Sequence, residues 1–312
     1  MNFQSFQYAA LALDPIHVGT GGSHLGRVDN TIVRDPVTRI PKIPGSSLAG
    51  VLRAYTAMAK DKYPGCAGQG QPDASGSGGH CGLADCPVCT VFGFAKGKDA
   101  NEGFAGLAAF SDMHVLLFPV PTLQGPVWVT SPLALRQSGI PTFAEVGNVQ
   151  NQEAIYRPKE QEHLDRLNIG WLYLSVEKSW SHWEKFEGLG LPEYITGRLA
   201  VVSDKLFGHV VNSNLEVRTS VAINPATGAA EDGALFTYEA LPRGTVLAGE
   251  ITCKNPKHYK IKGKEIKAVD SPEAVNGIVA EAHPYLEHLG IGGMGSRGMG
   301  RLRILKSGEE EA

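Results

Sequence analysis

The chain has 312 residues, of which 42% are hydrophobic and 20% are charged, so its composition is that of a globular protein with a substantial core. Its formal net charge is −3, which excludes a basic field over the whole molecule. If the chain binds a nucleic acid, it must use a local group of cations and backbone amides. The 38 glycines indicate many turns and few long helices.

Two features bear on where the protein resides. The first residues lack a charged segment followed by an apolar run, and no apolar run has the length of a membrane span. Four of the five cysteines lie between Cys66 and Cys89, a grouping that favours metal or thiol chemistry over a framework of disulfides. We therefore expect a cytoplasmic protein.

The N-terminal part alternates strand, loop and helix. Residues 6–14 read as a strand that opens into a glycine-rich loop at residues 17–29. An extended segment at residues 31–34 leads to a turn at residues 35–38. A helix follows Pro44-Gly45, with a serine cap from Ser46 or Ser47 and apolar residues at helical spacing, namely Leu48, Val51, Leu52 and Tyr55.

The rest of the chain is richer in strands. Apolar runs predict strands at residues 107–120, 126–135, 245–254 and 301–306. Two runs joined by a turn predict a long hairpin within residues 215–241. Helices are expected at residues 205–211 and 271–288, the second with a Ser271 cap, and residues 136–195 read as mixed helix and loop, an insertion. This order predicts an α+β fold with helices on one face of a sheet.

The cysteine group has the spacing of a metal site. Cys86-Pro87-Val88-Cys89 can place two thiolates on one cation, and Cys66 with Cys81 supplies a second pair, with His80 as the substitute ligand. Four thiolates suit zinc in a closed, structural site. The alternatives are free buried thiols or a redox pair, but the surrounding glycine-rich segment has no core to bury thiols. Cys253, within a predicted strand, reads as ordinary core.

The segment Gly45-Ser46-Ser47-Leu48-Ala49 resembles a nucleophile elbow, but two preceding prolines argue against the strand that an elbow needs. We interpret it instead as a helix N-terminus whose amides and hydroxyls bind phosphate, with charge from Lys42 and Arg53. Simple capping is the alternative.

A second glycine-rich loop spans residues 292–300. It lacks the Lys-Ser/Thr of a P-loop and lies between a helix and a strand, the reverse of a Rossmann motif. Its glycines and one arginine would still let a backbone pass close to a polyanion. In the first loop, Asp29 reads locally as a turn former, and His17 and His24 are possible RNA contacts. No triad or paired carboxylates stand out.

The order of these motifs resembles the RAMP superfamily of CRISPR proteins. The similarity is carried by RDPVTRIPKIPGSSLAGVLR after Val28-Asp29 and by the closing GGMGSRGMGRLRI. The segments AGLAAFSDMHVLLFPVPTLQGPVWVTSPLAL, RLAVVSDKLFGHVVNSNLEVRTSVAI and EDGALFTYEALPRGT are similar to the repeated backbone subunit of the Cmr (type III-B) effector complex. The ending is also similar to the Csm (type III-A) backbone, so the subtype stays open.

This resemblance implies a fold and an assembly. The fold is α+β, a ferredoxin-like (RRM-like) palm in one domain over residues 1–312. It carries a zinc-stabilised insertion at residues 61–104, a mixed insertion at 136–195 and a β-hairpin thumb at 212–240. The partners implied are a guide (CRISPR) RNA, a complementary target RNA, further copies of the chain in a filament and other type III subunits. Base pairing would then read the sequence, and the protein would read shape and backbone.

The resemblance also implies site residues. Asp29 matches the aspartate that cleaves target RNA with a divalent metal such as Mg²⁺ or Mn²⁺, by 2′-hydroxyl attack beside a flipped nucleotide. RNA contacts are expected from Lys42, Ser46, Ser47, Arg53, Arg34, Arg39, His17, Gly292, Gly293, Gly295, Ser296 and Arg297. The alternative is a non-catalytic RNA-binding subunit of the same kind of complex. A guide-processing endoribonuclease with a histidine base is a third class.

Overall fold

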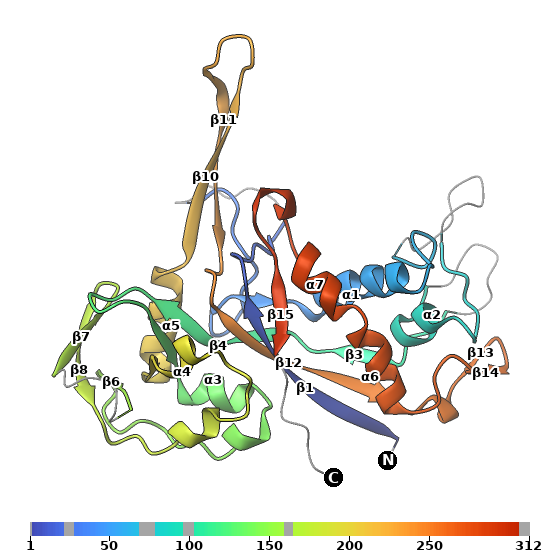
Figure 1. Ribbon diagram of the computed structural model, residues 1–312, viewed down its shortest axis with the longest axis horizontal. Helices are drawn as coiled ribbons and strands as arrows, with labels where there is room; N and C mark the ends of the chain where they lie inside the picture. Colours follow the sequence, from blue (N-terminus) through green and yellow to red (C-terminus); the bar gives the residue numbers. More distant parts are fainter. Residues whose placement is uncertain (1, 22–27, 69–78, 96–102, 159–164, 306–312) are drawn as a thin grey trace. The chain divides into compact units, whose positions relative to one another are not determined.

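The computed structural model describes residues 2–21, 28–68, 79–95, 103–158 and 165–305, and the chain packs as two compact units (Figure 1). The first unit consists of Met1–Tyr8, Pro44–Met113 and Gly249–Gly290. The second consists of Ala9–Ile43, His114–Ala248 and Ile291–Ala312. Each unit is assembled from three separate segments that alternate along the chain, and the single domain over residues 1–312 stays a prediction.

The second unit is built on a mixed sheet with the strand order β15-β1-β12-β4-β5-β9-β6-β8-β7. Neighbours β5 and β9 run parallel, as do β6 and β8, whereas β1–β15, β12–β4, β4–β5 and β7–β8 are antiparallel. The bounds are β15 (Leu302–Leu305), β1 (Phe3–Ala12), β12 (Val246–Lys254), β4 (Met113–Val120), β5 (Val127–Thr130), β9 (Leu199–Val201), β6 (Ala154–Tyr156), β8 (Leu172–Glu177) and β7 (Arg166–Ile169). A short strand, β2 (Lys42–Ile43), also pairs with β4. Strands β1 and β12 continue into the first unit.

The core of this unit follows from strands that are apolar on both faces. In β4 the run Val115–Phe118 is buried throughout, as expected for a central strand covered on both sides. Side chains from neighbouring strands and from the segment after β5 complete the cluster, including Leu117, Trp128, Phe143, Val201 and Val246. The indole of Trp128 also donates to the Gly244 carbonyl oxygen at 2.8 Å, which satisfies its buried polar atom.

Short helices connect the strands of the second unit. They are α3 (Pro132–Gln137), η1 (Pro141–Phe143), η2 (Trp183–Phe186), α4 (Glu193–Thr196), α5 (Asp204–Ser213) and η4 (Gly295–Arg297). The helix predicted at residues 205–211 is confirmed as α5, and the Ser203 hydroxyl caps it by accepting from Leu206 N at 3.4 Å. The prediction for residues 136–195 is wrong in one respect: β6, β7 and β8 lie there. They were missed because strands of three to six residues leave little periodic signal.

The first unit contains α1 (Gly45–Ala59), α2 (Pro87–Phe92), β3 (Ala108–Phe110), η3 (Pro256–His258), β13 (Lys260–Ile261), β14 (Lys264–Glu265), α6 (Pro272–Ala280) and α7 (His283–Leu289). The helix predicted at residues 271–288 is two helices, since Pro284 in the first turn of α7 has no N–H to continue α6. Its Ser271 cap is confirmed, with Ala274 N donating to the hydroxyl at 3.1 Å. No helix in the described parts of the chain is long and apolar enough to cross a membrane.

The predicted serine cap of α1 is wrong. The helix begins at Gly45, so Ser46 and Ser47 lie within its first turn, and no side chain caps it at Pro44. Instead, Gly45 N donates to Asp112 Oδ1 at 2.8 Å. A Cβ at position 45 would lie 2.4 Å from the Phe110 carbonyl oxygen, so this close approach requires glycine.

The predicted long hairpin is confirmed as β10 (Glu216–Ile223) and β11 (Ala230–Ala240), paired antiparallel from Glu216↔Ala240 to Ile223↔Ala230. Figure 1 shows it projecting beyond the sheet of its own unit. Several apolar side chains on it are exposed, including Val217, Val221, Ile223 and Leu235. A projecting hairpin with exposed apolar side chains is typical of an element that contacts a partner.

The two glycine-rich loops, far apart in sequence, meet in the second unit. Gly293 N donates to the His17 carbonyl oxygen at 2.8 Å, and Gly300 N donates to that of Pro15 at 2.9 Å. Gly292 has φ +85°, and a Cβ there would lie 2.3 Å from the His17 oxygen. The start of the first loop and the second loop therefore lie side by side. An RNA-binding groove formed by both loops requires this proximity.

Gly292→Ala should lower the free energy of unfolding by about 2 kcal/mol or more, because the left-handed backbone and the contact with His17 oppose a side chain together. Gly298→Ala is the matched control, since Gly298 has φ +76° but open space around its Cβ, and should lose about 1 kcal/mol. Urea denaturation measures both. Equal losses would show that the close approach at Gly292 is unimportant.

Candidate nucleic-acid interface and cysteine cluster

Asp29 is anchored to the hairpin through one residue, Thr237 of β11. Its Oδ2 accepts from Thr237 N at 2.7 Å and from Thr237 Oγ1 at 2.9 Å, while Asp29 N donates to Thr237 Oγ1 at 3.1 Å. The next residue extends the contact, because Asn30 N donates to the Thr237 carbonyl oxygen at 3.0 Å. Asp29 and Asn30 therefore lie along the base of the hairpin in a fixed register.

These hydrogen bonds set the charge of the carboxylate. Donation from the Thr237 backbone, and then from its hydroxyl, holds the pKa of Asp29 below the ordinary value for aspartate. The group is therefore ionised at neutral pH, where it makes a poor general base and a good oxygen ligand for a hard cation. Both hydrogen bonds that Thr237 donates to the carboxylate reach Oδ2 and not Oδ1.

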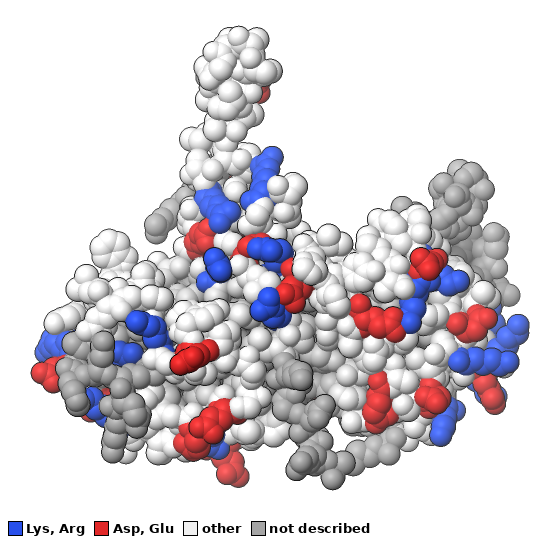
Figure 2. Space-filling model, viewed as in Figure 1, with Lys and Arg blue, Asp and Glu red and all other residues white. Residues whose placement is uncertain are grey.

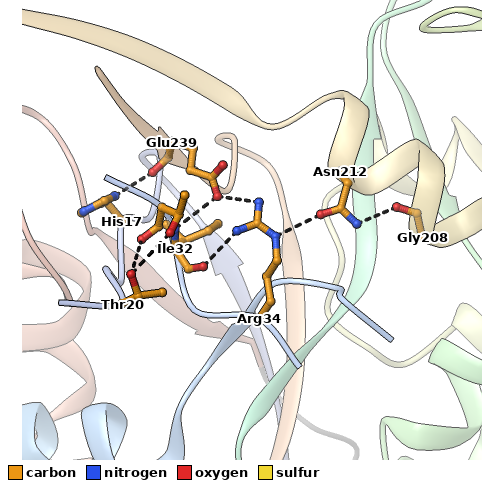
Figure 3. A network of polar contacts seen from close by, with 8 residues as sticks. His17, Thr20, Ile32, Arg34, Gly208, Asn212 and Glu239 are labelled. Carbon is orange, nitrogen blue, oxygen red and sulfur yellow. Dashed lines mark hydrogen bonds and ion pairs between the residues drawn. The ribbon is translucent and has the colours of Figure 1, made fainter. Parts of the chain in front are cut away.

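A polar network next to Asp29 fixes the base of the hairpin (Figure 3). Arg34 Nη2 lies 2.5 Å from Glu239 Oε2, its Nε donates to Asn212 Oδ1 at 3.1 Å, and its Nη1 donates to the Ile32 carbonyl oxygen at 3.0 Å. Ile32 N also donates to Glu239 Oε2 at 3.2 Å. Arg34 thereby ties β11, the segment after Asp29 and α5 together.

Two predicted RNA contacts, Arg34 and His17, belong to this network. All three side-chain nitrogens of Arg34 already bind protein acceptors. His17 is 7% exposed, with its Nδ1 2.6 Å from the Glu239 carbonyl oxygen and its ring edge against Tyr238. Both residues therefore hold the site together, and their contact with RNA stays a prediction. His24 lies outside the described residues.

The last loop completes the region. Arg297 is exposed, and its Nη1 donates to Ser220 Oγ on β10 at 3.2 Å. Beneath it, Met299 packs with Tyr238 and Ala240 at the hairpin base. The predicted contacts Gly292, Gly293, Gly295 and Ser296 are all exposed in this loop. The structure thus brings Asp29 and Arg297 to one hairpin, on strands β11 and β10.

Further arginines at this place were missed from the sequence. Arg301 binds Asp14 with Nε 2.5 Å from Oδ2 and Nη2 3.0 Å from Oδ1, and Arg243 and Arg218 add positive charge nearby. The hydrogen bond from Arg301, followed by these charges, lowers the pKa of Asp14. Figure 2 shows Lys and Arg gathered around the hairpin base, while its upper part is mostly uncharged. Because Arg218, Arg243 and Arg301 are far apart in sequence, no local motif predicted that they would gather here.

The remaining predicted contacts differ in accessibility. Arg39 is exposed at the end of the Asp35 turn, with φ +62°. Lys42 is half-buried on β2, and in the first unit Ser46 is exposed and Ser47 half-buried in the first turn of α1. Each of these positions leaves polar atoms near the surface.

Arg53, a predicted RNA contact, lies beside the cysteine cluster, and its contact with RNA stays a prediction. It is 9% exposed, and its Nε donates to the Cys66 carbonyl oxygen at 2.8 Å. Its Nη2 lies 2.7 Å from His80 Nδ1. Burial, and then the charge of Arg53, lowers the pKa of His80, so the neutral ring accepts this hydrogen bond. Arg53 therefore serves the cysteine cluster, and the Nδ1 of His80 is turned to Arg53.

The predicted gathering of four cysteines is confirmed. The sulfur atoms of Cys66, Cys81, Cys86 and Cys89 all lie within 4.8 Å of one another. Measured separations are 3.6 Å for Cys81–Cys89, 3.7 Å for Cys66–Cys89 and 4.0 Å for Cys66–Cys86. Zinc–sulfur bonds of about 2.3 Å in a tetrahedron place sulfurs about 3.8 Å apart. The cluster could therefore hold a metal such as zinc, and all five cysteines are free of disulfides.

Comparison with known proteins places the chain in a family. The model of the RAMP superfamily matches residues 10–303, so the chain belongs to the RAMP superfamily. It is 28% identical over 253 residues to the CRISPR system Cmr endoribonuclease Cmr4 of Pyrococcus furiosus, covering 75% of this chain and 77% of that protein. It is 34% identical over 90 residues to the CRISPR system Cms endoribonuclease Csm3 of Methanothermobacter thermautotrophicus, covering 28% and 32% of the two chains.

A solved structure shares the fold. A chain of the type III-B Cmr-beta complex bound to cognate target RNA superposes with a TM-score of 0.67 at 17% identity, covering 98% of both chains. The recognition of a RAMP protein similar to Cmr backbone subunits is thereby confirmed, together with a mixed α+β fold.

Arg34→Met should lower the free energy of unfolding by about 3 kcal/mol, since it leaves the carboxylate of Glu239, 9% exposed, without its cation. Adding Glu239→Gln should restore part of the loss, because the uncompensated charge is then removed. Denaturant unfolding of the two single variants and the double variant measures the coupling. Strictly additive losses would mean that the two side chains do not act as a pair.

Proposed function

We propose that this protein is a guide-RNA-binding backbone subunit of a type III CRISPR effector complex that cleaves complementary target RNA at regular intervals. The observation that carries the proposal is the ionised, half-buried carboxylate of Asp29, held at the base of a projecting hairpin beside a cluster of arginines. The names of its relatives, an endoribonuclease of Cmr systems and one of Cms systems, point the same way.

The cleavage step needs little from the protein. The 2′-oxygen of a ribose attacks the adjacent phosphorus as the bond to the 5′-oxygen breaks, which leaves a cyclic phosphate and a 5′-hydroxyl. The proton of the 2′-hydroxyl passes to solvent, and solvent protonates the departing oxygen. The substrate supplies its own nucleophile, so in-line geometry and charge stabilisation suffice. Asp29 would hold a divalent cation such as Mg²⁺ or Mn²⁺, whose charge stabilises the phosphate.

The second unit accounts for RNA binding without reading sequence. Arg297, Ser296 and the glycines at 292, 293 and 295 would contact the ribose-phosphate backbone, as would Arg39 and Lys42. In the first unit, Ser46 and Ser47 would each offer a hydroxyl to a phosphate. The hairpin within residues 212–240 would act as the thumb, because exposed Val221, Ile223 and Leu235 are suited to pack against unstacked bases. Further copies of the chain along one guide would give cuts at a regular spacing.

Asp29→Asn should reduce target cleavage at least 100-fold in the assembled complex, because the amide keeps the shape but loses the charge that holds a cation. The matched control is Asp35→Asn. Asp35 is a nearby turn aspartate whose Oδ1 accepts from Val37 N and Thr38 N, and it also has a lowered pKa. Cleavage of labelled target by complexes carrying each variant is compared on gels, with guide RNA content checked.

Unchanged cleavage by the Asp29→Asn complex would remove Asp29 from the mechanism. Protection of RNA at regular spacing with no cut product, in wild type and with any divalent metal, would instead favour the non-catalytic binding subunit.

We further propose that the four cysteines bind structural zinc. Three of them, Cys66, Cys86 and Cys89, are at most 3% exposed, and hydrogen bonds from neighbouring thiols, that of Cys89 first, lower the pKa of Cys86 to about 5. A divalent ion with four thiolates has a net negative charge, and the buried guanidinium of Arg53 lies beside it to offset that charge. Such a closed site would stabilise the insertion at residues 61–104.

Purified protein should contain about one zinc per chain, and Cys86→Ser with Cys89→Ser should abolish binding and lower the melting temperature. Cys253→Ala is the control, since Cys253 is buried outside the cluster. Elemental analysis and thermal melts with and without a chelator provide the measurements. Metal-free protein that melts identically with chelator would disprove the zinc site.

A further inference from the structure

The residue that orients Asp29 belongs to the hairpin, and this arrangement has a functional consequence. We propose that Thr237 is a positioning residue for cleavage, which fixes the Asp29 carboxylate and makes its placement depend on where the hairpin lies. This inference rests on the proposed function, and it adds a residue 208 positions away from Asp29 in sequence.

The hydrogen bonds fix the direction in which the Thr237 hydroxyl donates its proton. Its Oγ1 accepts the Asp29 N–H at 3.1 Å, so the single hydroxyl proton is directed to Asp29 Oδ2, 2.9 Å away. Thr237 N donates to the same Oδ2 at 2.7 Å. Two donors on one oxygen hold the carboxylate plane and leave Oδ1 as the oxygen that can face a cation or phosphate. Thr237 itself is not a ligand or an acid–base group.

The base of the hairpin is rigid enough for this dependence to matter. Asn30 pairs with Tyr238 as in a parallel strand, with Asn30 N donating to the Thr237 oxygen at 3.0 Å and Glu239 N donating to the Asn30 oxygen at 3.1 Å. One residue further along β11, the ion pair of Arg34 with Glu239 adds a second link between this strand and the segment after Asp29 (Figure 3). A shift of β11 therefore carries Asp29 with it.

The hairpin is also the element that would meet the RNA. Leu235, 65% exposed, lies two residues before Thr237 and so on the same face of β11. On the paired strand, Ser220 contacts Arg297. Because RNA that contacts the hairpin acts within two residues of Thr237, the placement of the Asp29 carboxylate relative to that RNA depends on the position of the hairpin.

The test uses full complexes assembled with guide RNA and complementary target. Thr237→Val keeps the shape and the backbone N–H but loses the hydroxyl, so we expect the single-turnover rate of cleavage to fall about 10- to 100-fold. Target affinity, measured by filter binding with the same RNA, should change less than about twofold. Thr237→Ser, which restores the hydroxyl, should recover most of the rate.

The outcomes separate the inference from the function on which it rests. Wild-type rates in Thr237→Val, alongside lost cleavage in Asp29→Asn, overturn the positioning role and leave the proposed function intact. Weaker target binding with an unchanged rate in the bound complex, or no rescue by serine, shows a merely structural role and also overturns it. Unchanged cleavage in Asp29→Asn overturns the catalytic assignment and the inference together.

Discussion

The partly buried ion pair between Arg34 and Glu239 is the interaction on which the candidate site depends. A charged pair in this environment gains little net stability, because desolvation opposes the attraction. What it supplies is a unique arrangement, since each group has only one set of partners that satisfies it. Here those partners belong to α5, to the segment after Asp29 and to β11. The register that results is the one that places Thr237 opposite Asp29.

In the first unit, the cysteine cluster stabilises a segment that has little hydrophobic core of its own. The segment around it is rich in glycine and poor in large apolar residues, so hydrophobic burial alone gives it little stability. Four sulfurs at metal-binding separations supply a local centre, and α1 contributes both the apolar side chain of Ala57 and the cation of Arg53. The cation of Arg53 is tolerated there because the Cys66 and Phe92 carbonyl oxygens and the His80 ring accept its hydrogen bonds.

The parts of this structure that the sequence predicts are those whose signal is local. The cysteine group, the hairpin, α5 and the Ser271 cap are each defined by residues close together in the chain. The sequence is less informative where burial or a distant partner decides. The serine cap of α1 was wrong because Asp112, 67 residues from Gly45, takes its place, and no motif reveals that Arg53 and His17 are 9% and 7% exposed. Thr237 could not be found at all, because its role exists only once two segments 208 residues apart are paired.

The acidic net charge of the chain is consistent with RNA binding once the distribution of charge is considered. Arg218, Arg243, Arg297 and Arg301 gather near the hairpin base, where Asp14 and Glu216 partly offset them through Arg301 and Arg218. Such a surface has a local field that decays within about 10 Å at moderate salt. It would therefore hold a backbone already guided by base pairing while drawing little unrelated nucleic acid from solution. In a complex whose sequence specificity comes from the guide, many weak protein contacts along one RNA backbone are sufficient to hold it.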